Sequence, residues 1–138
     1  MENEIQRLDR QKLKSFIARN SLVSVMNNTK WDRLRSLMLE ESGKLTSWKV
    51  KELMSEYNEE SRWDPDWRYH LPGYRHIEWL DINPRKMERR GQLLKDKVAD
   101  HSEYFIRLLK DNNIPFSIEA DNIRIWGYVW PNTPVNFV

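Results

Sequence analysis

The segment that decides the fold lies near the C-terminus and reads PFSIEADNIRIWGY at residues 115–128. Its apolar and polar residues alternate on both sides of Asp121-Asn122, which is the pattern of two half-buried strands joined by a tight turn. The predicted register places three pairs on one face of this hairpin: Ala120 opposite Ile123, Ile118 opposite Ile125, and Phe116 opposite Gly127.

The second face of this hairpin carries polar and aromatic side chains. Glu119 lies opposite Arg124 in the predicted register, which is a favourable cross-strand pair of opposite charge. Trp126 and Tyr128 share that face. Exposed aromatic side chains beside arginine act as anchors in protein interfaces and as stacking platforms for single-stranded nucleic acid. The chain holds seven tryptophans, so this face is a candidate aromatic binding surface. The alternative is that helices cover both faces of the sheet, because large apolar patches are rare on monomers.

Three further strands are expected upstream of this hairpin. Alternation of Trp48 and Val50 with lysines predicts a strand within residues 45–53. Two more strand-like segments, residues 67–71 and 74–82, flank Pro72-Gly73, a dipeptide that favours a tight turn. We therefore predict a second hairpin around Pro72-Gly73.

Helices are expected in three places. Apolar spacing predicts helical structure within residues 1–25, and Thr29 followed by Asp32 resembles a capping box at the start of a second helix. Asn83-Pro84 is a strong helix start. The stripe that follows it predicts one long helix over about residues 84–112, with apolar side chains at Met87, Leu94, Val98, Phe105 and Leu109.

Together these elements predict an α+β fold, in which an antiparallel sheet of about four to five strands packs against the N-terminal helices and the long helix. A length of 138 residues suits a single domain over residues 1–138. Residues 1–25 then form a helical N-terminal extension, and residues 26–138 form the core domain.

Composition excludes several classes of chemistry. The chain has no cysteine, so disulfides, cysteine zinc sites, iron–sulfur clusters and thiol catalysis are absent. Its apolar runs are too short for a transmembrane helix. Glu2 and Glu4 stand where a secretory signal would need basic and then apolar residues, so we expect a cytoplasmic protein without membrane contact.

The formal net charge is only +2, but one segment is densely basic. It contains Arg85, Lys86, Arg89 and Arg90 at the start of the predicted long helix. Clustered cations of this kind can contact nucleic-acid phosphates, although a solvated helix face is the simpler explanation.

One cluster of titratable residues lies between positions 64 and 81. Its members are Asp64, Asp66, His70, His76, Glu78 and Asp81. Carboxylates and imidazoles can hold a divalent metal or act as acid and base, so a metal-dependent hydrolase built around His70, His76 and Glu78 is one hypothesis. Turn caps and surface ion pairs are the simpler explanation, and we assign no metal, cofactor or catalytic residue.

Several short segments together resemble a family of small bacterial proteins of unknown function. They are Thr29-Lys30-Trp31, Trp67 with Tyr69-His70, Ile77-Glu78-Trp79-Leu80 and Ile123-Arg124-Ile125-Trp126-Gly127-Tyr128. The resemblance spans about residues 26–138 and implies a bacterial cytoplasmic domain. It implies no activity.

The leading hypothesis is a non-enzymatic module that binds another protein, by analogy with small immunity proteins that block toxins. Its candidate binding residues are Trp67, His70, His76, Glu78, Arg124, Trp126 and Tyr128. The first alternative is nucleic-acid binding by the basic segment, and the second is the metal-dependent hydrolase. The oligomeric state and the partner stay open.

Overall fold

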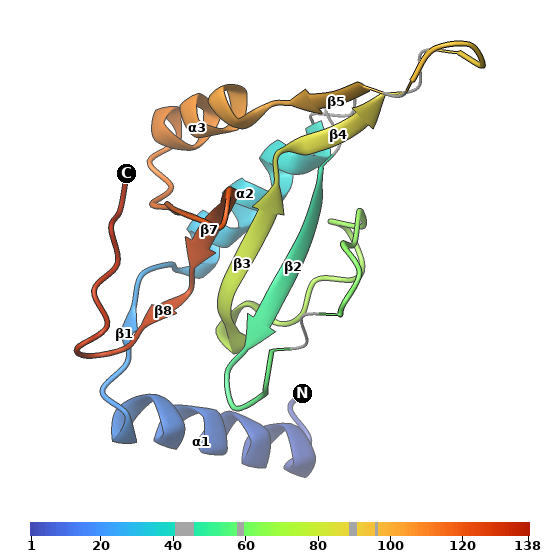
Figure 1. Ribbon diagram of the computed structural model, residues 1–138. Helices are drawn as coiled ribbons and strands as arrows, with labels where there is room; N and C mark the ends of the chain where they lie inside the picture. The colour runs from blue at the N-terminus through green and yellow to red at the C-terminus, as the bar shows by residue number, and fades with distance from the viewer. Residues whose placement is uncertain (41–45, 58–59, 89–90, 96) are drawn as a thin grey trace.

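The computed structural model describes residues 1–40, 46–57, 60–88, 91–95 and 97–138 (Figure 1). The helices in these ranges are α1 (Glu4–Arg19), α2 (Asn28–Glu40) and α3 (Ser102–Asp111), with a 3₁₀ turn at Tyr74–His76. The strands are β1 (Val23–Ser24), β2 (Ser47–Glu52), β3 (Ile77–Asn83), β4 (Arg85–Glu88), β5 (Lys97–Asp100), β6 (Ser117–Glu119), β7 (Asn122–Trp126) and β8 (Tyr128–Val129). Helices combined with antiparallel strands confirm the predicted α+β class.

The central element is a four-stranded antiparallel sheet in the order β2-β3-β7-β6. Strand β3 lies in its interior, and its first six residues are all buried. Two smaller antiparallel pairs, β1 with β8 and β4 with β5, lie outside this sheet. The predicted strand within residues 45–53 is thereby confirmed as β2.

Helices α2 and α3 supply apolar side chains to one face of the sheet, and Figure 1 shows α2 behind it. The core contains Trp31, Leu34 and Met38 from α2, Phe105 and Leu109 from α3, and Trp48, Leu80, Ile82, Ile123 and Ile125 from the strands. Each of these residues is at most 6% exposed. Alternation along the strands places the apolar strand residues of this set on one face, because successive side chains point to opposite faces.

The N-terminal helix packs on a separate, smaller cluster. Leu13 of α1 is buried with Leu22, Leu53 and Tyr128. Helix α1 begins at a capping box, in which Asn3 and Gln6 exchange side-chain and backbone hydrogen bonds. The segment after α1 then joins the fold through the β1–β8 pair.

The predicted long helix over residues 84–112 is wrong. Its first half forms the β4–β5 hairpin, and only Ser102–Asp111 is helical. Met87 and Val98, which the helical stripe placed on one helix face, are cross-strand partners. Gly91 has a φ of +108°, a conformation that a helix cannot contain and that glycine adopts without strain.

The predicted hairpin at Pro72-Gly73 is also wrong. Residues 67–71 form no strand, and Tyr74–His76 is the 3₁₀ turn that leads into β3. Asp66 organises the chain there, because its Oδ1 accepts hydrogen bonds from the backbone amides of Arg68 and Tyr69, both at 2.8 Å. An aspartate that binds backbone amides two and three residues ahead favours a turn over a strand.

The C-terminal hairpin exists, but its register differs by two residues from the prediction. Ile118 lies opposite Ile123, and Arg124 lies opposite Ser117 instead of Glu119. The turn is formed by Ala120 and Asp121, with φ values of +49° and +65°. Positive φ at both central residues defines a two-residue hairpin turn of the type that matches strand twist.

Candidate functional site

The face of the four-stranded sheet opposite α2 and α3 carries no aliphatic side chains at the paired positions of its centre. Cross-strand pairing places Lys49, Asp81, Arg124 and Ser117 in one row across the four strands. Lys51, Trp79 and Trp126 form the next row. We call this surface the Arg124 face, and it consists of these seven residues.

Arg124 is the centre of this face. Its guanidinium donates two hydrogen bonds to Asp81, from Nε to Oδ1 at 2.7 Å and from Nη2 to Oδ2 at 3.0 Å. The same guanidinium lies 3.7 Å from the ring centroid of Trp79 and 5.5 Å from that of Trp126. A bidentate carboxylate and two aromatic rings therefore fix its orientation.

The tryptophans of the Arg124 face are fixed as well. Trp126 donates its Nε1 hydrogen to Ser117 Oγ at 2.8 Å, and Ser117 donates in turn to Glu119 at 3.1 Å. Tyr57 packs on Trp79 at a ring separation of 4.9 Å. These contacts hold large side chains in single positions before any ligand arrives.

The cations of the Arg124 face have partners. Lys51 Nζ lies 3.1 Å from Glu78 Oε1, which also accepts a hydrogen bond from Trp130 at 3.1 Å. Lys49 lies 4.8 Å from the ring centroid of Trp63. With Arg124 paired to Asp81, little uncompensated positive charge is left to attract a polyanion.

Part of this surface remains accessible to a partner. The Arg124 side chain is 20% exposed and the Lys51 side chain 25%. Four of the seven tryptophans are buried, whereas Trp63, Trp126 and Trp130 are half-buried. Trp126 belongs to this face, and Trp63 contacts Lys49 of the same face. Trp130 donates a hydrogen bond to Glu78, which is the partner of Lys51.

The structure separates Trp67 and Tyr128 from Arg124 and Trp126. Trp67 is only 2% exposed and donates its Nε1 hydrogen to the backbone oxygen of Thr46. Tyr128 is buried against α1 and donates its hydroxyl hydrogen to the backbone oxygen of Arg75 at 2.9 Å. Burial removes both residues from the candidate surface.

His70 lies in an exposed acidic turn instead of on a strand. Its Nδ1 is 2.9 Å from Asp64 Oδ2, and its Nε2 is 3.5 Å from Asp66 Oδ2. The hydrogen bond to Asp64, reinforced by the charges of Asp64 and Asp66, raises the pKa of His70. The turn is therefore a local ion-pair cluster.

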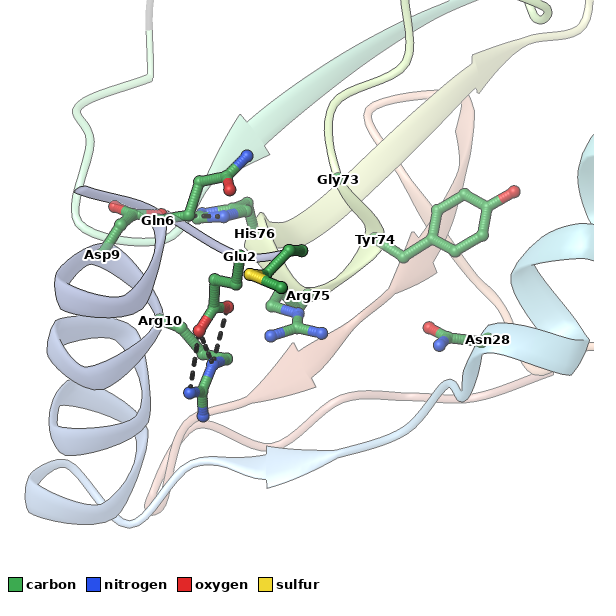
Figure 2. Close-up of a pocket in the computed structure, with 10 residues that line it drawn as sticks. Glu2, Gln6, Asp9, Arg10, Asn28, Gly73, Tyr74, Arg75 and His76 are labelled. Atoms are coloured by element: carbon green, nitrogen blue, oxygen red, sulfur yellow. Dashed lines mark hydrogen bonds and ion pairs between the residues drawn. The ribbon is translucent and has the colours of Figure 1, made fainter. Parts of the chain in front are cut away.

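His76 lines a groove of about 520 Å³ between α1 and residues 73–76 (Figure 2). Its Nε2 lies 3.3 Å from Asp9 Oδ2 of α1. In the same groove Arg10 donates two hydrogen bonds of 3.0 Å to Glu2, and this contact lowers the pKa of Glu2. The His76–Asp9 pair ties α1 to the turn before β3, whereas the Arg10–Glu2 pair lies within the N-terminal segment.

The titratable residues of the proposed hydrolase do not converge. His70 pairs with Asp64, His76 with Asp9, Glu78 with Lys51. Across the described ranges, no group of three or more His, Asp or Glu side chains is placed to hold a metal ion. The metal-dependent hydrolase therefore has no geometric support.

Arg85 and Lys86 lie on strand β4 of the hairpin and not on a helix. Arg85 donates hydrogen bonds of 2.7 Å to the backbone oxygen of Asp121 and to Asn122 Oδ1, whereas Lys86 is exposed. Arg89 and Arg90 lie outside the described residues.

Sequence reasoning missed Trp79, Asp81 and Ser117 as members of this face. Asp81 entered the predictions only as a member of the titratable cluster, and Trp79 only through the family resemblance. The available signal was alternation, because Trp79 and Asp81 are two residues apart on one strand, as are Arg124 and Trp126.

The fold and this face define an α+β domain with an apolar core on one side of its sheet and an arginine–tryptophan cluster on the other. A family model described as a family of unknown function, DUF6678, matches residues 13–132. The chain belongs to this family, which confirms the expected resemblance and extends it into α1. No curated protein and no solved structure matches the chain. No helix within the described segments is long and apolar enough to cross a membrane.

Proposed function

We propose that this protein is a non-enzymatic module that binds another protein through its Arg124 face. The observation that carries the proposal is the Arg124 guanidinium, held between Trp79 and Trp126 and bound bidentately by Asp81. Tryptophan and arginine dominate the energy of protein interfaces when they lie at the centre of a patch. A cytoplasmic location in a bacterium belongs to the same proposal.

Preorganisation supports this role. Immobilising a side chain with many rotamers costs about 0.5–1.5 kcal/mol during association. On this face Arg124 and Trp126 are already fixed by hydrogen bonds and ring contacts, so a partner does not have to order them. Both side chains are partly exposed and can therefore contact a partner.

Charge supports a protein over a polyanion at this surface. Arg124 and Lys51 are each paired with a carboxylate, and Lys49 lies over an aromatic ring. Nucleic-acid affinity depends chiefly on cations that neutralise phosphates, and cations already paired contribute little to it. A protein partner needs only shape, aromatic contact and a few hydrogen bonds. An immunity protein that blocks a toxin is one example of such a module.

The test compares partner capture by the wild-type protein and by Trp126→Ala. Both are expressed with a tag in the native cell, cross-linked in vivo, purified after nuclease treatment and quantified by mass spectrometry. We expect a specific protein whose recovery falls about tenfold or more in Trp126→Ala, since a hot-spot loss exceeds about 1.4 kcal/mol.

The matched control is Tyr69→Ala, because Tyr69 is an aromatic residue that is 81% exposed and lies outside the Arg124 face. Its recovery of the partner is expected to equal that of the wild type. Equal recovery by Trp126→Ala, with an unchanged melting temperature, would remove the Arg124 face as the binding surface.

A further inference from the structure

The β4–β5 hairpin carries the whole net positive charge of the chain. Residues 85–100 contain six Lys or Arg and three Asp or Glu, which gives a net charge of +3. Because the full chain has a net charge of +2, the remaining residues have a net charge of −1. The excess of cations over anions is therefore concentrated in this segment, where it favours contact with a polyanion.

The hairpin is an isolated two-stranded ribbon that extends beyond the end of the central sheet (Figure 1). Its base is firmly attached. Arg85 binds Asp121 and Asn122 of the neighbouring turn, and the backbone amide of His101 donates to Pro84 O at 2.8 Å. Motion of the arm relative to the sheet is limited by these contacts.

The two faces of the ribbon differ in chemistry. Lys86 and Lys97 lie on one face of the ribbon. Lys86 pairs with Ala99, and Lys97, which pairs with Glu88, lies two residues before Ala99 on β5 and therefore on the same face. Met87 and Val98 are paired on the other face and are 60% and 54% exposed. The ribbon is thus amphipathic without any covering layer among the described residues.

Two leucines lie near the far end of the arm. Leu93 is 99% exposed and Leu94 is 58% exposed. Exposed aliphatic side chains beside cations have an unfavourable free energy in water and gain stability when a partner covers them. The arm therefore combines charge that suits phosphates with apolar groups that need burial.

We propose that the β4–β5 ribbon binds B-form duplex DNA, with its lysines on the phosphates and the leucines of its far end inserted at a base step. Two-stranded β-ribbons of DNA-binding proteins lie in the major or the minor groove of B-DNA, and architectural proteins that bind the minor groove insert leucine or methionine between base steps. Residues 85–100 contain no aromatic residue, which disfavours a stacking platform for single strands. This proposal is independent of protein binding at the Arg124 face.

The test is fluorescence anisotropy with a fluorescein-labelled 20-base-pair DNA duplex of mixed sequence, titrated between 50 and 200 mM NaCl. If about four phosphates are neutralised, the affinity falls about 100-fold over this range. The double variant Lys86→Glu, Lys97→Glu is expected to weaken binding at least tenfold and to reduce the salt slope by about two.

The matched control is the double variant Lys12→Glu, Lys14→Glu. Both lysines are exposed on α1, and the double variant changes the net charge by the same amount as Lys86→Glu, Lys97→Glu. Its salt slope is expected to equal that of the wild type. Leu93→Ser with Leu94→Ser is expected to keep the salt slope and to abolish duplex bending measured by energy transfer between end labels. Trp126→Ala is expected to bind the duplex with the affinity of the wild type. Failure of the DNA-binding proposal is therefore distinguishable from failure of the proposal that the Arg124 face binds a protein.

Three results would overturn the proposal. The first is the absence of duplex binding at 50 mM NaCl, and the second is duplex binding that Lys86→Glu, Lys97→Glu leaves unchanged. The third is hairpin-dependent binding only to vesicles of seven parts phosphatidylcholine and three parts phosphatidylserine, which would assign the arm to an anionic membrane surface. The melting temperature of each variant is measured as a control. We expect it to equal that of the wild type, because the substituted residues lie outside the core.

Discussion

The four-stranded sheet and the β4–β5 hairpin are both antiparallel, and both contain apolar and charged residues. They differ in how far their apolar side chains are buried. In the sheet, Leu80, Ile82 and Ile125 are fully buried beneath α2 and α3. In the hairpin, Met87 and Val98 are more than half exposed. Two strands without a second layer cannot cover their own apolar face, so Met87 and Val98 stay exposed in this chain.

Charge follows the same contrast. Asp81 is only 3% exposed, and its carboxylate is bound by Arg124 from the neighbouring strand. The hairpin, by comparison, has three more cations than anions. The sheet thus uses its charges for internal structure, whereas the hairpin presents a net charge to its surroundings. Substitutions in the two regions should differ accordingly, and the following predictions run from the largest expected effect to the smallest.

Gly127→Ala should have the largest effect, because it strikes the point where β7 passes into β8 beside β3. A Cβ at this position would lie 2.0 Å from Ile77 O, and the Gly127 amide is held by Glu78 O at 2.8 Å. The atoms in the way are all backbone atoms of β3, which cannot turn aside as a flexible side chain would. We expect a loss of at least about 4 kcal/mol in the free energy of unfolding, measured by urea denaturation. A loss below 1 kcal/mol would show that the strands can separate locally.

Asp81→Ala tests the buried charge of the sheet. It leaves Arg124 mostly buried between two tryptophans without its carboxylate, which costs free energy because the charge stays desolvated. We expect a loss of about 2–3 kcal/mol in the free energy of unfolding, somewhat less than for a fully buried pair, since Arg124 keeps 20% exposure. The double variant Asp81→Ala, Arg124→Met should recover much of this loss, and equal stability of the single and double variants would contradict the pairing argument.

Met87→Ala and Val98→Ala test the hairpin side of the comparison. Both side chains are exposed, so each truncation should change the free energy of unfolding by less than about 0.5 kcal/mol. The matched substitution in the sheet, Ile125→Ala, removes a fully buried side chain and should cost about 3 kcal/mol. Comparable losses in both regions would mean that the hairpin is covered in solution.

The smallest effect concerns pH. The pKa of His70 is raised by its hydrogen bond to Asp64, so the protonated imidazole is stabilised in the folded protein. The resulting stabilisation is complete below the unfolded pKa of about 6.5 and is lost as the pH rises through the higher folded pKa. We expect His70→Asn to be less stable than the wild type at pH 5.5 and closer to it at pH 8.5 in thermal melts. A gap that widens with pH would reverse the assignment.

The failed helix prediction explains where local patterns mislead. Met87, Leu94, Val98, Phe105 and Leu109 recur at helical spacing, but the first three lie on a hairpin and the last two on α3. A spacing of seven and four apolar residues cannot distinguish a helix from two antiparallel strands, because the spacing does not show where the chain reverses direction. Gly91 lies at the break and has a positive φ.

The amino-acid sequence by itself determined the local elements. Apolar spacing and polar caps act over two to seven residues, and they define α1, α2, the alternating strands β2, β3 and β7, and the C-terminal hairpin. Only the tertiary structure decided which strands are neighbours and in what register. It brings Asp81 to Arg124 across 43 residues of sequence and places Trp79 opposite Trp126. These contacts depend on closing long loops and packing the helices on one sheet face, and no local pattern encodes that choice.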